Sequence, residues 1–227
     1  MFHFHSPREH WQLRCQLDLP DEFHYASLPL CVIDAVFSIG VTYTSTQATV
    51  ARFADRQGWA LGPVPDRETG EHPIRDLITI LSGVSPQEAA ETLFGNRQRT
   101  SSRSGILKAE AVGRFARVLL DHGIDDFPDA TAERLAQAEP HIKQIPGQRS
   151  GISFDYFRML AGDEGFIKPD RMVLRYIAKA ISVDDKTITP DLARLVLPMV
   201  TETLNLANGF RWSNRTLDYA VWKTTSA

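Results

Sequence analysis

Asp170 is the residue of this sequence whose type and position most directly suggest chemistry. It follows Pro169 and precedes a segment with helical spacing, 171–181. A carboxylate at the start of a helix is an expected N-cap, which stabilises a helix by about 1 kcal/mol. The same group can also stabilise a developing positive charge or deprotonate a water molecule. The sequence leaves both interpretations of Asp170 open.

Upstream of Asp170, a Pro-Gly turn lies between two predicted helices. Ile145-Pro146-Gly147 ends the predicted helix 131–143, and the next predicted helix covers 153–161. The N–H groups of such a turn, with the N-terminus of the second helix, can bind a phosphate. A Pro-Gly turn is also a common tight connection. The order of turn and carboxylate favours the phosphate-binding interpretation.

The stretch from Ile145 to Ile181 resembles the helix-hairpin-helix Gly/Pro-Asp superfamily of DNA glycosylases, to which endonuclease III belongs. The hairpin of that family runs approximately Leu-Pro-Gly-Val-Gly-x-Lys-Thr-Ala, and residues 145–153 stand in its place. Gly162, Pro169-Asp170 and Arg175 match the residues that follow the hairpin. The resemblance extends over about 27–222 and is sharpest over 105–181.

The resemblance implies an all-α fold of two packed helical layers, with the DNA and the base in the cleft between them. Its implied partner is double-stranded DNA that contains a damaged or modified base. Asp170 is the implied catalytic residue. The implied phosphate-binding residues are Gly147, Arg149, Gly151, Arg171 and Arg175.

Two departures from the family pattern bear on the activity. Gly151 stands where bifunctional members carry the attacking lysine, so no amine is there to form a Schiff base. The implied enzyme is therefore a monofunctional glycosylase that leaves an abasic site and has no lyase activity. Arg149 replaces a second glycine at a turn position that favours positive φ, so the hairpin is open to remodelling.

Two alternatives remain beside the enzyme. Arg149 and the small residue Gly40 are mild support for a non-catalytic DNA-binding relative of the same fold, whereas the retained Asp170 favours catalysis. Upstream of the hairpin, residues 105–110 and 119–123, followed by Phe127-Pro128, resemble the Lys-Ala helix and Gly-Pro loop of the family. These matches, with those after the hairpin, disfavour an all-α protein that has no role on nucleic acid.

The candidates for a base pocket or wedge come from the first predicted helix. Asp34 interrupts an apolar run and is either a buried polar group with a partner or a pocket residue. Gly40 lies near the sequence position that matches the glutamine wedge of endonuclease III. Glycine is too small to fill the space that a base leaves in the DNA stack when it rotates out. Tyr43 is a possible substitute, with a core or loop aromatic as the alternative.

The charge of the chain is unevenly distributed. The formal net charge of −3 disfavours nucleic-acid binding by itself, because phosphate contacts need Lys and Arg. However, six basic residues stand against one acidic residue from Arg97 to Arg117, and seven against four from Lys143 to Lys179. Acidic residues are concentrated in stretches such as 121–129. This distribution predicts a basic face on an acidic body.

The remaining composition excludes several classes of protein. Cys15 and Cys31 match no zinc pattern and are too few to hold an iron-sulfur cluster, so we expect neither a metal nor a cofactor. The apolar run 28–41 is too short to span a bilayer. We therefore expect a monomeric cytoplasmic protein, nucleoid-associated if bacterial, with no membrane partner.

No segment shows the two-residue alternation of a strand, so helices are expected throughout. We predict an N-terminal arm over 1–26 and one helical domain over 27–227. Within the domain, six helices over roughly 58–182 form one layer, and the N-terminal helix with 183–227 forms the second. The predicted helices cover 27–57, 73–82, 85–95, 105–122, 131–143, 153–161, 171–181 and 190–206, before a tail that contains Trp212, Asp218 and Trp222.

Overall fold

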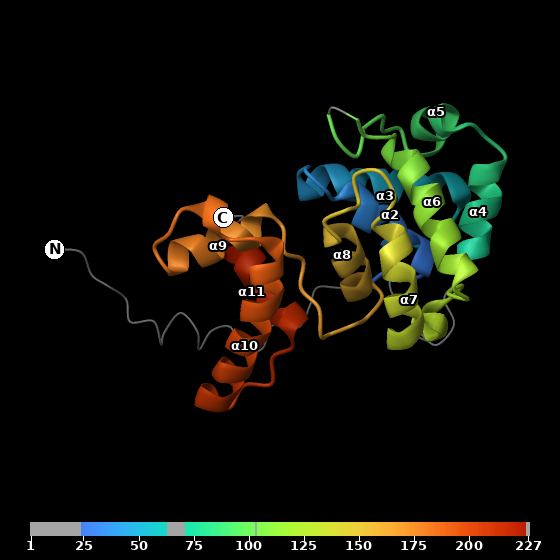
Figure 1. Cartoon of the computed structure of the whole chain (residues 1–227). Helices are drawn as coiled ribbons and strands as arrows, with labels where there is room; N and C mark the ends of the chain where they lie inside the picture. The colour runs from blue at the N-terminus through green and yellow to red at the C-terminus, as the bar shows by residue number, and fades with distance from the viewer. Residues whose placement is uncertain (1–23, 63–70, 103, 226–227) are drawn as a thin grey trace. The chain divides into compact units, whose positions relative to one another are not determined.

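A computed structural model of the chain describes residues 24–62, 71–102 and 104–225 (Figure 1). Every regular element in these ranges is a helix, apart from one isolated bridge between Arg99 and Leu107. The all-α prediction is thus confirmed for the described ranges. Most of the predicted arm 1–26 lies outside them.

The chain forms two compact units, which differ from the two predicted layers. The N-terminal unit contains Asp21–Asp163, and the C-terminal unit contains Glu164–Ala227. The helix expected to join the C-terminal layer, Leu28–Phe37, belongs to the N-terminal unit, whereas the helix after Asp170 belongs to the C-terminal unit. The reason is burial, because each of these helices has its apolar partners inside its own unit.

The N-terminal unit is built around α2 (Leu28–Phe37), which is buried at every position. In Figure 1, α2 (blue) lies among α3, α6 and α8, against which it packs. The other elements of this unit are α3 (Tyr43–Gln57), α4 (Ile74–Ser82), α5 (Pro86–Glu88), the π-helical turn η2 (Ala89–Leu93), α6 (Lys108–Asp121), the 3-10 turn η3 (Phe127–Asp129), α7 (Ala132–Ile142) and α8 (Ile152–Leu160).

The single helix predicted over 27–57 is wrong, because the chain turns between α2 and α3. Gly40 has a φ of +74°, the left-handed conformation that interrupts a helix. Lys108 then holds the end of α2, since its Nζ donates hydrogen bonds to the carbonyl oxygens of Phe37 at 2.9 Å and Ile39 at 2.8 Å. The side chain of Lys108 is almost fully buried, at 2% exposed.

The C-terminal unit has a small core of its own. It contains α9 (Arg171–Ala180), the 3-10 turn η4 (Asp185–Thr187), α10 (Pro190–Asn208) and α11 (Asn214–Thr225). Both α9 and α10 pack against α11. The buried side chains of this core include Ile167, Val173, Ile177, Ile188, Leu197, Trp212, Leu217 and Val221.

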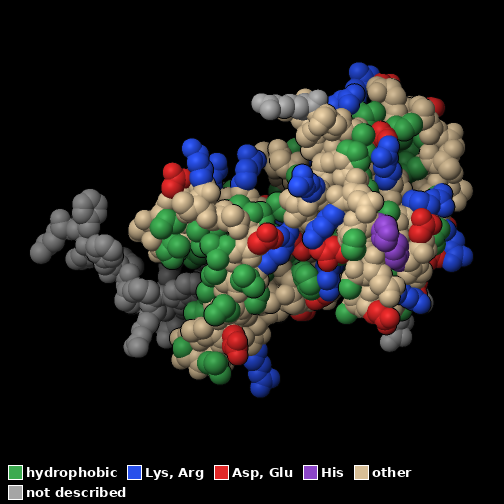
Figure 2. All heavy atoms as spheres, in the orientation of Figure 1, with side chains coloured by type: hydrophobic (Ala, Val, Ile, Leu, Met, Phe, Trp, Pro, Cys, Tyr) green, Lys and Arg blue, Asp and Glu red, His purple; other side chains and the backbone are tan. Residues whose placement is uncertain are grey.

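Several apolar residues of this unit do not join the core. Ile181 is 58% exposed, because α9 ends at Ala180 and Ile181 is its C-cap. On α10, the side chains of Leu195, Met199 and Leu206 are exposed, and Figure 2 shows hydrophobic side chains gathered over this helix. Within the described ranges, each helix is too short or too polar to cross a lipid bilayer.

Candidate functional site

The turn between α7 and α8, residues 143–151, has the two left-handed glycines that a tight Pro-Gly connection needs. Gly147 has a φ of +87° and Gly151 a φ of +75°. The backbone closes on itself twice, because the N–H of Gln148 donates to the carbonyl of Ile145 at 2.9 Å and the N–H of Gly151 to that of Gln148 at 3.0 Å. The first N–H groups of α8 have no partner within the helix and lie at the end of this turn.

Gly147 also allows a neighbouring loop to pack against the turn. A Cβ atom at this position would overlap the side chain of Thr100, so a larger residue would force Thr100 away. Thr100 belongs to the basic loop 96–102, in which Arg97 pairs with Glu91 at 3.0 Å. The turn and this loop therefore form one continuous part of the surface.

Arg149 does not strain the turn. Among the non-glycine residues of the described ranges, positive φ occurs at Ser182 and not at Arg149. The left-handed conformations fall on Gly147 and Gly151 instead, so the concern raised by the missing second glycine does not apply. Arg149 is exposed and has no ion pair with any described residue, which leaves its charge available at the tip of the turn.

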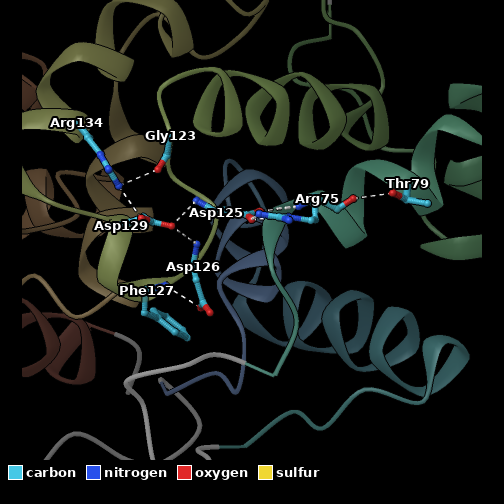
Figure 3. Close-up of polar contacts among 8 residues, drawn as sticks. All are labelled: Arg75, Thr79, Gly123, Asp125, Asp126, Phe127, Asp129 and Arg134. Carbon is cyan, nitrogen blue, oxygen red and sulfur yellow. Dashed lines mark hydrogen bonds and ion pairs between the residues drawn. The ribbon is translucent and has the colours of Figure 1, made fainter.

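The loop before α7 is held by a network of acidic and basic side chains (Figure 3). Asp129 accepts a hydrogen bond from Arg134 at 2.6 Å and two more from the N–H groups of Asp125 and Asp126. Burial raises the pKa of Asp129, but these bonds outweigh it and leave the pKa below its usual value. Asp125 in turn pairs with Arg75 of α4. The acidic run thus fixes the start of α7, the helix that leads into the turn.

Asp34 lies inside the N-terminal unit with two tyrosines. Its side chain is fully buried, and its Oδ2 accepts hydrogen bonds from the hydroxyl groups of Tyr25 at 2.9 Å and Tyr156 at 3.4 Å. Burial and the charge of Asp34 raise the pKa of Tyr25. Of the two interpretations of Asp34, these contacts support the buried polar group with partners.

The two other pocket candidates lie at the turn between α2 and α3. Gly40 is exposed, and a Cβ atom there would meet no neighbouring atom. Tyr43 is the first residue of α3 and is half-buried, and its hydroxyl lies near enough to Tyr25 to raise the pKa of that residue. This inward hydroxyl agrees with the core or loop aromatic that the sequence left open.

In the C-terminal unit, Asp170 is the N-cap of α9. Its Oδ1 accepts hydrogen bonds from the N–H groups of Met172 at 2.8 Å and Val173 at 3.3 Å. Its Oδ2 accepts none from the described residues, and the side chain is half-buried. The capping interpretation is confirmed, and among the described residues it uses one of the two carboxylate oxygens.

The basic residues of α9 follow one stripe of the helix. Arg171, Arg175 and Lys179 are exposed, whereas Val173 and Ile177 are buried on the opposite side. Figure 2 shows Lys and Arg side chains projecting over this part of the C-terminal unit. Arg175 lies 3.6 Å from Asp185, and Arg171 has no ion pair with a described residue. The stripe begins at the residue directly after Asp170.

Asp218 is a second carboxyl group near Asp170, and the sequence analysis did not assign it a role. It lies on α11, is 7% exposed, and its Oδ1 accepts a hydrogen bond from the N–H of Lys168 at 2.9 Å. Burial is the main cause that raises its pKa to about 7; the charge of Asp170 raises it further, whereas Lys168 lowers it. The sequence feature that could have identified Asp218 as a buried carboxyl group is its position among apolar residues of a helix, next to Leu217.

The pKa of Asp218 predicts a loss of stability as the pH rises. Its pKa is higher in the folded chain than in the unfolded chain, so the folded state binds more protons between pH 4 and pH 7. The free energy of unfolding should therefore fall across this range, by at most about 4 kcal/mol from this group. Urea unfolding of the wild type and Asp218→Asn from pH 4 to 8 tests this. An equal pH dependence in both proteins would contradict it.

In its described part the chain is thus all-α: the N-terminal unit has a tight turn whose Arg149 forms no ion pair with a described residue, and the C-terminal unit has two neighbouring carboxyl groups. The family model described as Domain of unknown function (DUF8548) matches residues 8–226, and the chain belongs to this family. Comparison with curated proteins and with solved structures gives no match.

Proposed function

We propose that this protein is a monofunctional DNA N-glycosylase. It binds double-stranded DNA, takes up a damaged or modified base that has rotated out of the duplex, and hydrolyses the bond between base and sugar. The product is an abasic site in an uncut strand. The observation that carries the proposal is Asp170, which caps α9 with Oδ1 and keeps Oδ2 for a ligand.

The contribution of Asp170 to the reaction follows from charge. As the glycosidic bond breaks, the sugar develops the positive charge of an oxocarbenium ion. Because two backbone hydrogen bonds to Oδ1 fix the carboxylate, its other oxygen, Oδ2, needs no rearrangement to stabilise that charge. The same oxygen can orient or deprotonate the attacking water molecule. Stabilisation of the sugar cation does not depend on which base leaves, so the proposal covers damaged and modified bases as a class.

The DNA contacts are proposed for residues of both units. In the turn, Gly147 and Arg149 are exposed and offer a backbone N–H group and a positive charge to a phosphate, whereas Gly151 is buried, its N–H is bonded to the carbonyl of Gln148, and it shapes the turn. In the C-terminal unit, Arg171 and Arg175 add positive charge beside Asp170. These contacts bind the backbone of DNA and carry no sequence information.

The absence of an amine at Gly151 supports hydrolysis without lyase activity. The nearest lysine in the turn, Lys143, pairs with Glu139 at 2.5 Å. The lysine of α6, Lys108, is buried and bonded to backbone carbonyl groups. Neither is placed to attack a sugar, which favours water as the nucleophile.

A duplex with a charged abasic analogue tests the proposal without knowledge of the base. A pyrrolidine nucleotide carries a protonated amine where the sugar of the transition state is positive, and a tetrahydrofuran nucleotide has the same shape without charge. Transition-state mimics bind at least about 100-fold more tightly than ground states. We expect the pyrrolidine duplex to bind at least tenfold more tightly than the tetrahydrofuran duplex. Equal affinities would contradict the proposed catalysis and, if both are high, would favour a non-catalytic DNA-binding relative.

The phosphate contact of Arg149 predicts a specific change in salt dependence. Arg149→Gln should weaken binding to duplexes of any sequence and reduce the slope of log K against log salt by about 1. Arg211→Gln is the control and should leave the slope unchanged, because Arg211 is an exposed arginine outside both basic stretches and outside the turn. Fluorescence anisotropy at several salt concentrations measures both slopes. An unchanged slope for Arg149→Gln would remove this residue from the interface.

A further inference from the structure

The position of Asp218 beside Asp170 is set by the core of the C-terminal unit. Its neighbours on α11, Leu217 and Val221, are both buried in that core, so the helix cannot rotate without exposing them. Asp218 is 7% exposed. A carboxyl group held in this way is costly to bury, and it forms no ion pair with a described residue that would offset the cost.

The backbone of Lys168 connects the two carboxyl residues. Its N–H donates to Oδ1 of Asp218 at 2.9 Å, and its carbonyl accepts from the N–H of Asp170 at 2.7 Å. The tight turn that delivers Asp170 to the start of α9 is therefore anchored to α11 through Asp218. An ionised or a protonated carboxyl group can accept this hydrogen bond, and so can the side-chain amide of asparagine.

The two carboxyl groups also act on one another electrostatically. In the described part of the chain, the charged groups that shift the pKa of Asp218 are Lys168, which lowers it, and Asp170, which raises it; α10, also packed on α11, contributes none. Together with burial they bring the pKa to about 7. Loss of the negative charge of Asp170, or its neutralisation by a cation, must therefore make Asp218 easier to ionise.

We propose that Asp218 is a positioning residue for Asp170 that gives up its proton to solvent when a cationic sugar occupies the site. The inference rests on the proposed function of Asp170. In the free protein near neutral pH, Asp218 carries a proton for much of the time, and Asp170 provides the negative charge alone. When the positive charge of the sugar neutralises Asp170, Asp218 ionises and a second negative charge stabilises the cation.

The coupling can be measured without DNA. Carbon-13 NMR of the side-chain carboxyl groups gives the pKa of Asp218 in the wild type, Asp170→Asn and Asp184→Asn. Asp184 is the control, because it is an exposed N-cap in the same unit. We expect a lower pKa of Asp218 in Asp170→Asn and an unchanged one in Asp184→Asn. An unchanged pKa in Asp170→Asn would overturn the inference and leave the proposed function untouched.

The functional consequence is a pH-dependent preference for positive charge. The affinity ratio of the pyrrolidine duplex to the tetrahydrofuran duplex should rise from pH 6 to pH 8 in the wild type, up to about tenfold for a pKa change of one unit. In Asp218→Asn, which keeps the hydrogen bond to Lys168, the ratio should stay constant. A wild-type ratio that is large but constant would overturn the role of Asp218 alone, whereas a ratio of one at every pH would overturn the proposed function. If Asp218→Asn does not fold, the NMR comparison decides the question.

Discussion

Asp170→Asn is expected to reduce the rate of base release by between about 100-fold and 10,000-fold, the range for a lost catalytic base. Asparagine caps helices about as well as aspartate, so its side-chain oxygen can accept the same bonds from Met172 and Val173. The variant should fold normally and bind undamaged duplex DNA as the wild type does. What it lacks is the negative charge that stabilises the sugar cation.

The control for this variant is Asp184→Asn. Asp184 caps η4 through a hydrogen bond from the N–H of Lys186, so the substitution changes the same chemical group in the same unit. Single-turnover base release and circular dichroism should be measured on both proteins. Full release by Asp170→Asn would exclude Asp170 as the catalytic residue. A similar loss in Asp184→Asn would point to a general effect of charge.

Lys108→Met is expected to lower the free energy of unfolding by about 3–5 kcal/mol, as removal of one partner of a buried charged contact does. The Nζ of Lys108 donates to the carbonyl oxygens of Phe37 and Ile39 and to Oε1 of Gln98 at 3.2 Å. It supplies positive charge at the C-terminus of α2, where the helix dipole is negative. Methionine has nearly the same length and leaves these oxygens buried without a donor.

Lys143→Met is the control, because it shows how much stability the chain loses when a surface lysine is replaced by methionine. The side chain of Lys143 is 38% exposed, and its ion pair with Glu139 is of the surface type, which contributes about 1 kcal/mol or less. Urea unfolding followed by circular dichroism gives the free energy for each protein. If Lys108→Met is within 1 kcal/mol of the wild type, the buried lysine is not what holds the end of α2.

Helix boundaries could be predicted where capping residues stand next to a periodic segment. Thr131 accepts a hydrogen bond from the N–H of Arg134, as its position before α7 suggests, and Asp170 caps α9. The helix 27–57 was predicted incorrectly, because its apolar pattern continues across the turn. The left-handed Gly40 and the buried Lys108 end α2 there, and Lys108 comes from a distant segment that no local pattern connects to it.

The candidate site could be predicted only as far as it is local in sequence. The hairpin glycines and Asp170 lie in one continuous stretch, and the structure gives each a defined conformation there. Asp218 lies on a later helix and approaches Asp170 through packing of α11, so its importance depends on tertiary contacts. At Arg149 the sequence motif suggested backbone strain that the structure does not show, because Arg149 does not have a positive φ.

Base release from a panel of duplexes is the most direct test of glycosylase activity. The wild-type protein is incubated with duplexes that contain uracil, alkylated purines, oxidised purines or modified cytosines, and each strand is examined before and after heating in alkali. We expect a free base and an intact strand from at least one substrate, with the strand cut at that position only after alkali. Cleavage before alkali would contradict the monofunctional mechanism. No release from any substrate, together with duplex binding that is the same in wild type and Asp170→Asn, would contradict catalysis altogether.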